Sequence, residues 1–168
     1  MNAYRHRRFE ALLGALLPDL YRYALWLCHD PALAEDLVQD CMLRAWRKLD
    51  SLRDDAAAKS WAITILRREL ARHWERKRLD TVDVDAVPVA DAAALGLDDA
   101  AEHANLRRAI ACLPEKYREP LTLQVLLGHS VEEIAGFMEL KVPTVLTRLF
   151  RARKLLAEAL DVSLEVSA

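Results

Sequence analysis

Cationic and hydroxyl side chains recur at helical spacing near the end of the chain. A helix is predicted from about Pro143 to Leu160, and its outward positions carry Thr144, Thr147, Arg148, Arg151 and Lys154. An α-helix fits the DNA major groove, where arginine can donate two hydrogen bonds to guanine, while hydroxyl groups and further cations hold phosphates. The pattern predicts a DNA-reading helix, and the alternative is an ordinary helical hairpin with a solvated basic face.

A second cationic cluster lies between Trp61 and Arg78. It contains only two carboxylates, Glu69 and Glu75, against six basic residues, which are Arg67, Arg68, Arg72, Arg76, Lys77 and Arg78. Positive charge beside flat aromatic rings is what a single strand requires for its backbone and its unstacked bases. The alternative is a core helix with solvated arginines, and for Trp61 and Trp74 individually we expect burial. The polar side of this helix is a predicted phosphate-binding surface under either interpretation.

The first of these clusters depends on a predicted helix-turn-helix. Gly128 ends the preceding helix, and Ser130 with Glu133 has the S-x-x-E spacing of a capping box that opens a short helix from Val131 to Met138. After a turn at 139–141, the longer helix has apolar residues at steps of three and four, namely Val142, Val145, Leu149, Ala152 and Leu156. This stripe predicts the buried side of the helix and leaves the cations on the outside.

The second cluster depends on a predicted helical bundle. Pro31 suits the first turn of a helix that runs to about Leu49, because an amide hydrogen would be unpaired there anyway. Apolar residues recur along this helix at three- and four-residue steps and predict one buried stripe: Leu33, Leu37, Val38, Cys41, Met42, Ala45, Trp46 and Leu49. A polar stretch at 50–55 precedes a further helix that begins near Ala56. No segment has a strand pattern.

Charge is unevenly distributed along the chain. The net charge of the 168 residues is −2, but residues 1–78 carry +4, residues 79–105 carry −7 without a single Lys or Arg, and residues 106–168 carry +1. Segment 79–102, which also contains Pro88 and Gly96, is predicted to be a flexible, partly disordered acidic linker that binds DNA poorly. The predicted architecture is therefore all-α, with two small helical domains at 1–78 and 103–168.

No residue pattern predicts catalysis, a metal site or a cofactor. The five histidines are scattered, the three cysteines lack C-x-x-C spacing, and no phosphate-binding loop, H-E-x-x-H or G-x-S-x-G motif is present. No run of about eighteen apolar residues predicts a membrane span. The N-terminal arginines are not followed by the apolar segment of a signal peptide. The sequence predicts a non-enzymatic, cytoplasmic protein.

Two segments carry motifs of one known family. Leu33 to Asp40, read with Leu43 to Trp46, and the region from Leu113 to Arg153 resemble the signature helix and the promoter-reading domain of the extracytoplasmic-function (ECF) sigma factors of bacterial RNA polymerase. The resemblance covers nearly the whole chain, in the right order. It implies that 1–78 is sigma region 2, which docks on the polymerase clamp and melts the minus-ten element, and that 103–168 is sigma region 4, which reads the minus-thirty-five element.

The resemblance also assigns candidate site residues. Polymerase would be bound by Glu35, Asp36, Leu37, Gln39, Asp40 and Arg44. A loop at 49–60 would hold a flipped base, and minus-ten DNA would be contacted by Arg53, Lys59, Trp61, Arg67, Arg68, Arg72 and Arg76. Minus-thirty-five DNA would be contacted by Thr144, Thr147, Arg148, Phe150, Arg151, Arg153 and Lys154.

The chain departs from the family pattern at four of its positions. Many members have Asn where Arg68 stands and Asp where Arg72 stands, and Pro143 and Leu146 replace a common Gly and Lys. The two additional arginines strengthen contact with phosphates and leave the details of the base pocket undetermined. Leu146 removes one possible contact with a phosphate or a base.

The implied partners are core RNA polymerase, through its clamp and flap, promoter DNA, and an anti-sigma factor that covers residues 37–46 and 145–156. No membrane insertion is predicted. One alternative is a conventional helix-turn-helix regulator, which would bind duplex DNA stably without polymerase. Another is a sigma-like decoy, but such decoys normally carry a receiver domain, for which 168 residues leave no room.

Overall fold

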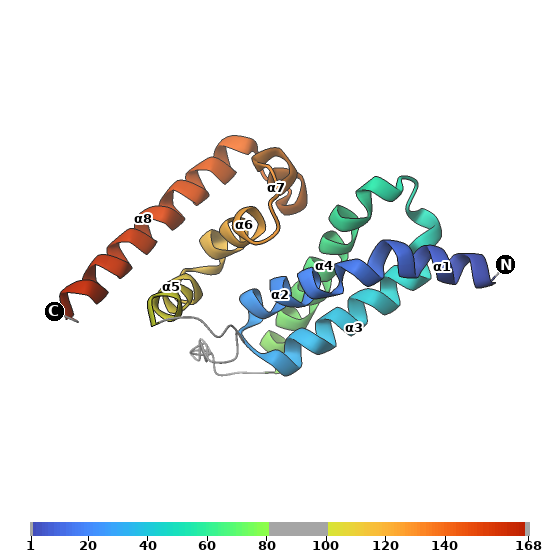
Figure 1. Cartoon of the computed structure of the whole chain (residues 1–168), viewed down its shortest axis with the longest axis horizontal. Coiled ribbons are helices and arrows are strands. Elements are labelled where there is room, and N and C mark those ends of the chain that lie inside the picture. Colours follow the sequence, from blue (N-terminus) through green and yellow to red (C-terminus); the bar gives the residue numbers. More distant parts are fainter. Residues whose placement is uncertain (1, 81–100, 167–168) are drawn as a thin grey trace. The chain divides into compact units, whose positions relative to one another are not determined.

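The regular elements of this protein are helices. The computed structural model describes residues 2–80 and 101–166, and no strand occurs within these ranges (Figure 1). The α-helices are α1 (Asn2–Leu13), α2 (Leu17–Cys28), α3 (Pro31–Lys48), α4 (Ala58–Asp80), α5 (Ala101–Ala111), α6 (Glu115–Val125), α7 (Val131–Met138) and α8 (Val142–Val166). Short 3-10 helices lie at Gly14–Leu16, Leu49–Ser51 and Asp55–Ala57. The all-α prediction is confirmed.

The described residues form two compact units. The first unit contains residues 2–24 and 32–80, and the second contains residues 25–31 and 101–166. Two helical units agree with the predicted architecture, while the domain limits at 78 and 103 stay predictions. Most of the predicted linker, residues 81–100, lies outside the described residues. Its ends, 79–80 and 101–102, belong to α4 and α5, so these helices extend beyond the predicted limits.

In the first unit, α3 buries most of its predicted apolar stripe. The buried positions of the helix are Ala34, Leu37, Val38, Cys41 and Ala45. Leu49 follows with no exposed surface, and α4 contributes the fully buried Ala62 and Ile63. Leu33, Met42 and Trp46, also predicted in the stripe, are half-buried. Full burial of a large aliphatic side chain is worth about 1.5–3 kcal/mol, so these contacts stabilise the packing of α3 in the first unit.

In the second unit, α8 packs on α5, α6 and α7. Val145, Leu149 and Ala152 are buried, as the stripe predicts, whereas Val142 and Leu156 are half-buried. The helix continues to Val166, beyond its predicted end near residue 160. One side of α8 is thus fixed by packing, and its other side is left to solvent.

A short capped helix and a tight turn set the position of α8. The predicted capping box is present: Ser130 Oγ accepts the amide of Glu133 at 3.2 Å, and Glu133 Oε2 accepts the amide of Ser130 at 2.8 Å. The observed helix, Val131–Met138, has the predicted limits. Glu139 then adopts the left-handed conformation with φ of 54°, and this residue stops α7 and redirects the chain into α8.

Ser130→Ala is expected to destabilise the second unit by about 1 kcal/mol, because the amide of Glu133 loses its acceptor. Ser130→Asp keeps an oxygen at the cap and should retain most of the wild-type stability. Urea unfolding followed by circular dichroism measures both variants. Equal midpoints for Ser130→Ala and the wild type would show that this cap contributes nothing to the fold.

Candidate nucleic-acid interface

The outward side of α8 carries the side chains that the sequence predicts for it. Thr144, Thr147 and Arg151 are exposed and Arg148 is half-buried. The Thr147 hydroxyl donates to the backbone carbonyl of Pro143 at 2.9 Å, which leaves its oxygen able to accept a hydrogen bond. This side of the helix offers guanidinium groups and hydroxyl groups in one row.

Two residues of α6 extend this row into a groove. The groove has a volume of about 400 Å³ and is lined by Lys116, Tyr117, Pro143, Thr144, Thr147, Arg148 and Arg151. Arg151 Nη1 donates to the Tyr117 hydroxyl at 3.4 Å, and this hydrogen bond is the main reason why the pKa of Tyr117 lies below its usual value. Lys116 Nζ lies 4.9 Å from the centroid of the Tyr117 ring. Cations and hydroxyl groups around one groove suit a phosphate backbone.

Sequence reasoning missed Lys116 and Tyr117. A sequence feature that could have indicated them is their position just after Pro114, in the first turn of α6. Nothing in the local pattern, however, indicates that this turn faces α8. Tyr117 and Arg151 are 34 residues apart, and only the packing of α6 on α8 brings them together.

Three residues predicted for the same DNA contact lie outside this groove. Phe150 is 68% exposed, and Arg153 Nη2 donates to Gln124 Oε1 of α6 at 2.5 Å. Lys154 Nζ lies 3.9 Å from a carboxylate oxygen of Glu158 on the next turn. Helical periodicity turns positions 150 and 153 away from Arg148. The structure therefore gathers Thr144, Thr147, Arg148 and Arg151 and separates the other three.

The polar side of α3 is distinct from its buried stripe. Glu35, Asp36, Gln39 and Asp40 are exposed. Leu37 is only 4% exposed, so its side chain does not share this polar side, and its assignment to polymerase stays a prediction. Position 37 lies on the apolar stripe, and its side chain packs into the core of the first unit.

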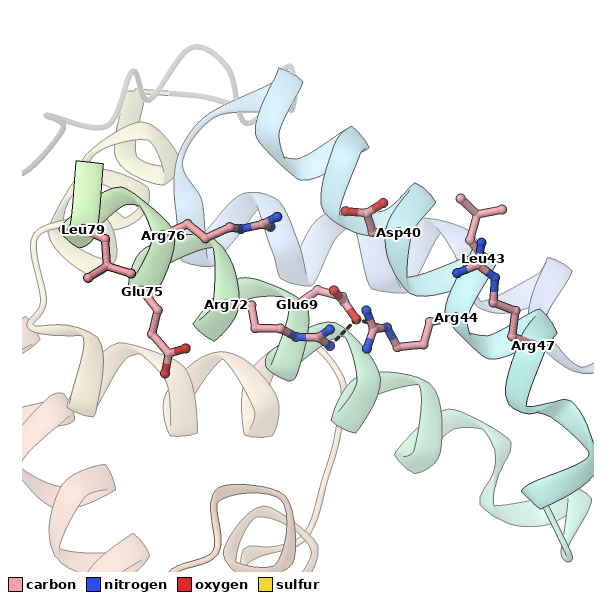
Figure 2. Close-up of a pocket in the computed structure, with 9 residues that line it drawn as sticks. All are labelled: Asp40, Leu43, Arg44, Arg47, Glu69, Arg72, Glu75, Arg76 and Leu79. Atoms are coloured by element: carbon pink, nitrogen blue, oxygen red, sulfur yellow. Dashed lines mark hydrogen bonds and ion pairs between the residues drawn. The ribbon is translucent and has the colours of Figure 1, made fainter. Parts of the chain in front are cut away.

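A second groove lies between α3 and α4 (Figure 2). It has a volume of about 380 Å³ and is lined by Asp40, Leu43, Arg44 and Arg47 from α3 and by Glu69, Arg72, Glu75, Arg76 and Leu79 from α4. The sequence assigns Asp40 and Arg44 to polymerase but Arg72 and Arg76 to minus-ten DNA. The fold places these two sets of residues side by side.

Glu69 holds two arginines of this groove. Its Oε1 lies 2.5 Å from Nε of Arg44 and 2.5 Å from Nη2 of Arg72, and Figure 2 shows both guanidinium groups turned toward its carboxylate. The residue is 4% exposed, and a buried carboxylate is stable only when it is paired and hydrogen-bonded. Arg44 and Arg72 are thus partly engaged inside the protein, and sequence reasoning missed the carboxylate that holds them.

The remaining residues predicted for minus-ten DNA are spread over α4 and the segment before it. Arg53, Arg68 and Arg76 are exposed, and Arg67 is half-buried. Lys59 Nζ lies 3.1 Å from Asp19 Oδ2 of α2, so its charge is paired within the first unit. Of this set, Arg53, Arg68 and Arg76 present their cations to solvent.

The two tryptophans of α4 are half-buried, so the expectation of burial is wrong for both. Smaller residues such as Ala62 and Ile63 occupy the interior side of the helix. Trp74 has Lys77 Nζ 5.4 Å from its ring centroid. Trp61 precedes Arg68 by seven residues, a spacing that puts the ring and the guanidinium on one side of α4.

Within residues 2–80 and 101–166, no three His, Cys, Asp or Glu side chains gather as metal ligands would. No helix in these ranges is long and apolar enough to cross a bilayer. The candidate interface consists of cations, hydroxyl groups and carboxylates on helix surfaces.

Known proteins resemble both units of the chain. The Sigma-70 region 2 family matches residues 12–79, and the Sigma-70, region 4 family matches residues 103–156. The ECF RNA polymerase sigma-E factor of Escherichia coli K12 is 35% identical over 139 residues, which cover 75% of this chain and 71% of that protein. The ECF RNA polymerase sigma factor EcfG of Rhodopseudomonas palustris is 31% identical over 149 residues, with coverage of 88% and 82%.

A solved structure is also similar over most of the chain. It is the sigma factor RpoE from Bartonella quintana, crystallised in complex with the anti-sigma factor NepR. Its TM-score is 0.75 at 28% sequence identity, and the match covers 92% of this chain and 97% of that one. The similarity therefore extends from the sequence to the fold.

Glu69→Gln is expected to lower the free energy of unfolding by about 1.5–3 kcal/mol, the range for hydrogen bonds to a charged group. The neutral amide cannot balance two guanidinium groups. Glu75→Gln, an exposed carboxylate change in the same groove, is the matched control and should shift stability by less than about 0.5 kcal/mol. Urea unfolding measures the free energy of unfolding of both variants. Equal losses of stability would show that the ion pairs of Glu69 contribute no more than the exposed carboxylate of Glu75.

Proposed function

This chain belongs to the extracytoplasmic-function (ECF) sigma factors of RNA polymerase, and from that membership we propose how its two units share promoter-specific transcription initiation. In the predicted domain 1–78, α3 binds core polymerase and α4 binds the melted minus-ten strand. The predicted domain 103–168 contacts the polymerase flap and reads the minus-thirty-five element with α8. The protein performs no catalysis, and it acts in the cytoplasm, where polymerase transcribes.

The observation that carries this proposal is the separation of buried and exposed sides on α3 and α8. Asp36 and Asp40 are exposed on a helix whose opposite stripe is buried. On α8, Arg151 is exposed and Arg148 is half-buried at the edge of the stripe that contains the buried Val145. Packing therefore holds each helix rigid while its charged side chains are presented to partners. Rigid presentation limits the entropy lost on binding.

Recognition of duplex DNA by the second unit combines two kinds of contact. Lys116 and Tyr117 bind backbone phosphates from α6 and fix the register of the unit on DNA. Arg148 and Arg151 reach base edges in the major groove, where bidentate hydrogen bonds select guanine. The groove between α6 and α8 supports this division, because it places the phosphate-binding groups beside the base-reading ones.

Melting of the minus-ten element falls to the first unit. A base must leave the stack before it can be read in a pocket, at a cost of a few kcal/mol. The connection at 49–60 receives this base, and Trp61 with Arg68 supplies an aromatic face and a phosphate contact on one side of α4. Arg53 adds an exposed cation within the connection itself.

An anti-sigma factor is the proposed regulator. The similar RpoE structure contains such a protein. In this chain, an inhibitor that covers residues 37–46 and 145–156 occupies both partner-binding helices at once. An interface of this kind buries on the order of 2,000 Å² or more.

Asp36→Lys/Asp40→Lys is expected to abolish co-purification with core polymerase and promoter-dependent transcription, because two docking carboxylates become cations. Single exposed ion pairs are weak, so both positions are changed together. Glu10→Lys/Glu132→Lys alters the net charge equally at exposed positions away from α3 and should leave co-purification intact. Normal polymerase binding by the Asp36/Asp40 variant would remove this surface from the proposal.

Arg148→Ala and Arg151→Ala are each expected to weaken minus-thirty-five binding by roughly 1–3 kcal/mol and to relax base preference. The melting temperature should change little, because neither side chain is part of the core. Arg108→Ala, an exposed cation on α5, is the control for a general loss of charge. Run-off transcription and DNA-binding assays with holoenzyme measure these effects. Stable, sequence-specific duplex binding by the wild type without polymerase would favour a conventional regulator instead.

A further inference from the structure

Helix α1 is closely bound to the segment that joins α3 to α4. Figure 1 shows α1 in blue at the N-terminal end of the chain. The match to Sigma-70 region 2 begins at residue 12, so nearly all of α1 lies outside it. We call residues 49–57, the part of the 49–60 segment that precedes α4, the α3–α4 connection. The contacts of Arg5 and Arg8 with this connection and with the end of α3 are specific and polar.

Arg8 binds the α3–α4 connection at two points. Its Nη2 donates to Asp55 Oδ1 at 2.7 Å and its Nε to the same oxygen at 3.2 Å. The Nη2 group also lies 2.9 Å from the backbone carbonyl of Leu52. The flat, forked guanidinium group suits this arrangement, which an ammonium group could not reproduce. One α1 side chain therefore fixes the spacing between residues 52 and 55.

Arg5 secures the point where the connection begins. Its Nη2 donates to the carbonyl of Trp46 at 2.6 Å, an acceptor in the last turn of α3 that the helix itself leaves free. The guanidinium carbon lies 5.0 Å from the centroid of the Trp46 ring, and Phe9 packs edge-on against that ring at 5.2 Å. Asp50 Oδ2 lies 3.5 Å from the same Nη2. The end of α3 is therefore held against α1.

Between the points held by Arg5 and Arg8, the connection keeps its own order. The amide of Leu52 donates to the carbonyl of Leu49 at 3.1 Å, and Asp54 Oδ1 accepts the amide of Ala56 at 3.0 Å. Arg53 lies within this stretch with its side chain exposed. A segment fixed at both ends, with an exposed cation in the middle, is already shaped for a ligand.

We propose that α1 is a positioning element for minus-ten recognition, in which Arg8, supported by Arg5, holds the α3–α4 connection in the shape that receives the flipped base. This inference rests on the proposed function, which assigns the base to this connection. Arg8 acts through the connection and not by contact with DNA. Holding the connection in place before DNA arrives removes the entropy cost of ordering it during melting.

The test uses the full chain with core polymerase and a promoter that the wild-type holoenzyme selects from a random library. Binding is measured on a fork-junction probe with a single-stranded minus-ten region and on a duplex probe containing only the minus-thirty-five element. Arg8→Ala should weaken fork-junction binding by about ten- to a hundred-fold, as small misplacements of a binding group do. Affinity for core polymerase and for the duplex probe should stay unchanged. Arg8→Lys should fall between Arg8→Ala and the wild type.

Two further variants separate positioning from charge and from folding. Arg7→Ala is the matched control, because Arg7 is exposed and its Nε donates to the carbonyl of Ala3 in its own helix, at 3.4 Å, and to no other group among the residues that the structure describes. Asp55→Ala removes a negative charge, so a purely electrostatic role predicts tighter DNA binding, whereas positioning predicts weaker binding. Melting temperatures of all variants identify any general loss of fold.

The proposal is overturned if Arg8→Ala binds the fork junction as tightly as Arg7→Ala does, or if Asp55→Ala binds it more tightly than the wild type. It is also overturned if the polymerase affinity and the melting temperature of Arg8→Ala fall in parallel with its probe binding. Failure of the wild type to bind core polymerase or any promoter would instead contradict the proposed function. Loss confined to the fork-junction probe in both Arg8→Ala and Asp55→Ala supports the positioning role.

Discussion

A buried negative charge sets the geometry of the first unit. Glu69 lies almost wholly inside a small helical core, where an unpaired carboxylate would be severely unfavourable. The core can accept it only because Arg44 reaches it from α3 and Arg72 from its own helix. These pairs restrict how α3 and α4 can slide or rotate against each other, a restriction that apolar packing alone imposes more loosely.

This constraint has a functional consequence, because the two helices are proposed to bind different partners. α3 presents the carboxylates proposed for polymerase, and α4 presents the ring and cations proposed for the melted strand. Since one carboxylate bonds to arginines of both helices, the two surfaces have a fixed relation to each other. Under the proposed function, docking on polymerase also orients the side of α4 that is proposed to bind the strand.

In both units, a stripe of buried apolar residues packs one side of a helix against the core. The opposite side of that helix is exposed and available to partners. In the second unit the stripe of α8 is supplemented by the capping box of α7 and the left-handed turn at Glu139. These local devices determine where α8 begins. The groove beside it arises because the first turn of α6 packs nearby, with Tyr117 within hydrogen-bond distance of Arg151.

The sequence by itself determined what depends on neighbours within one or two helical turns. Apolar periodicity predicted the buried sides of α3 and α8, and the S-x-x-E spacing predicted both the limits and the cap of α7, because these interactions connect residues three or four positions apart. The family motifs likewise lie within continuous segments. Only the tertiary structure decided which polar groups meet across helices. Arg8 pairs with Asp55 across 47 residues of chain, and no local pattern encodes that distance. The same reason explains the missed role of Glu69 and the burial of Leu37, since packing between helices decides which side chains face inward.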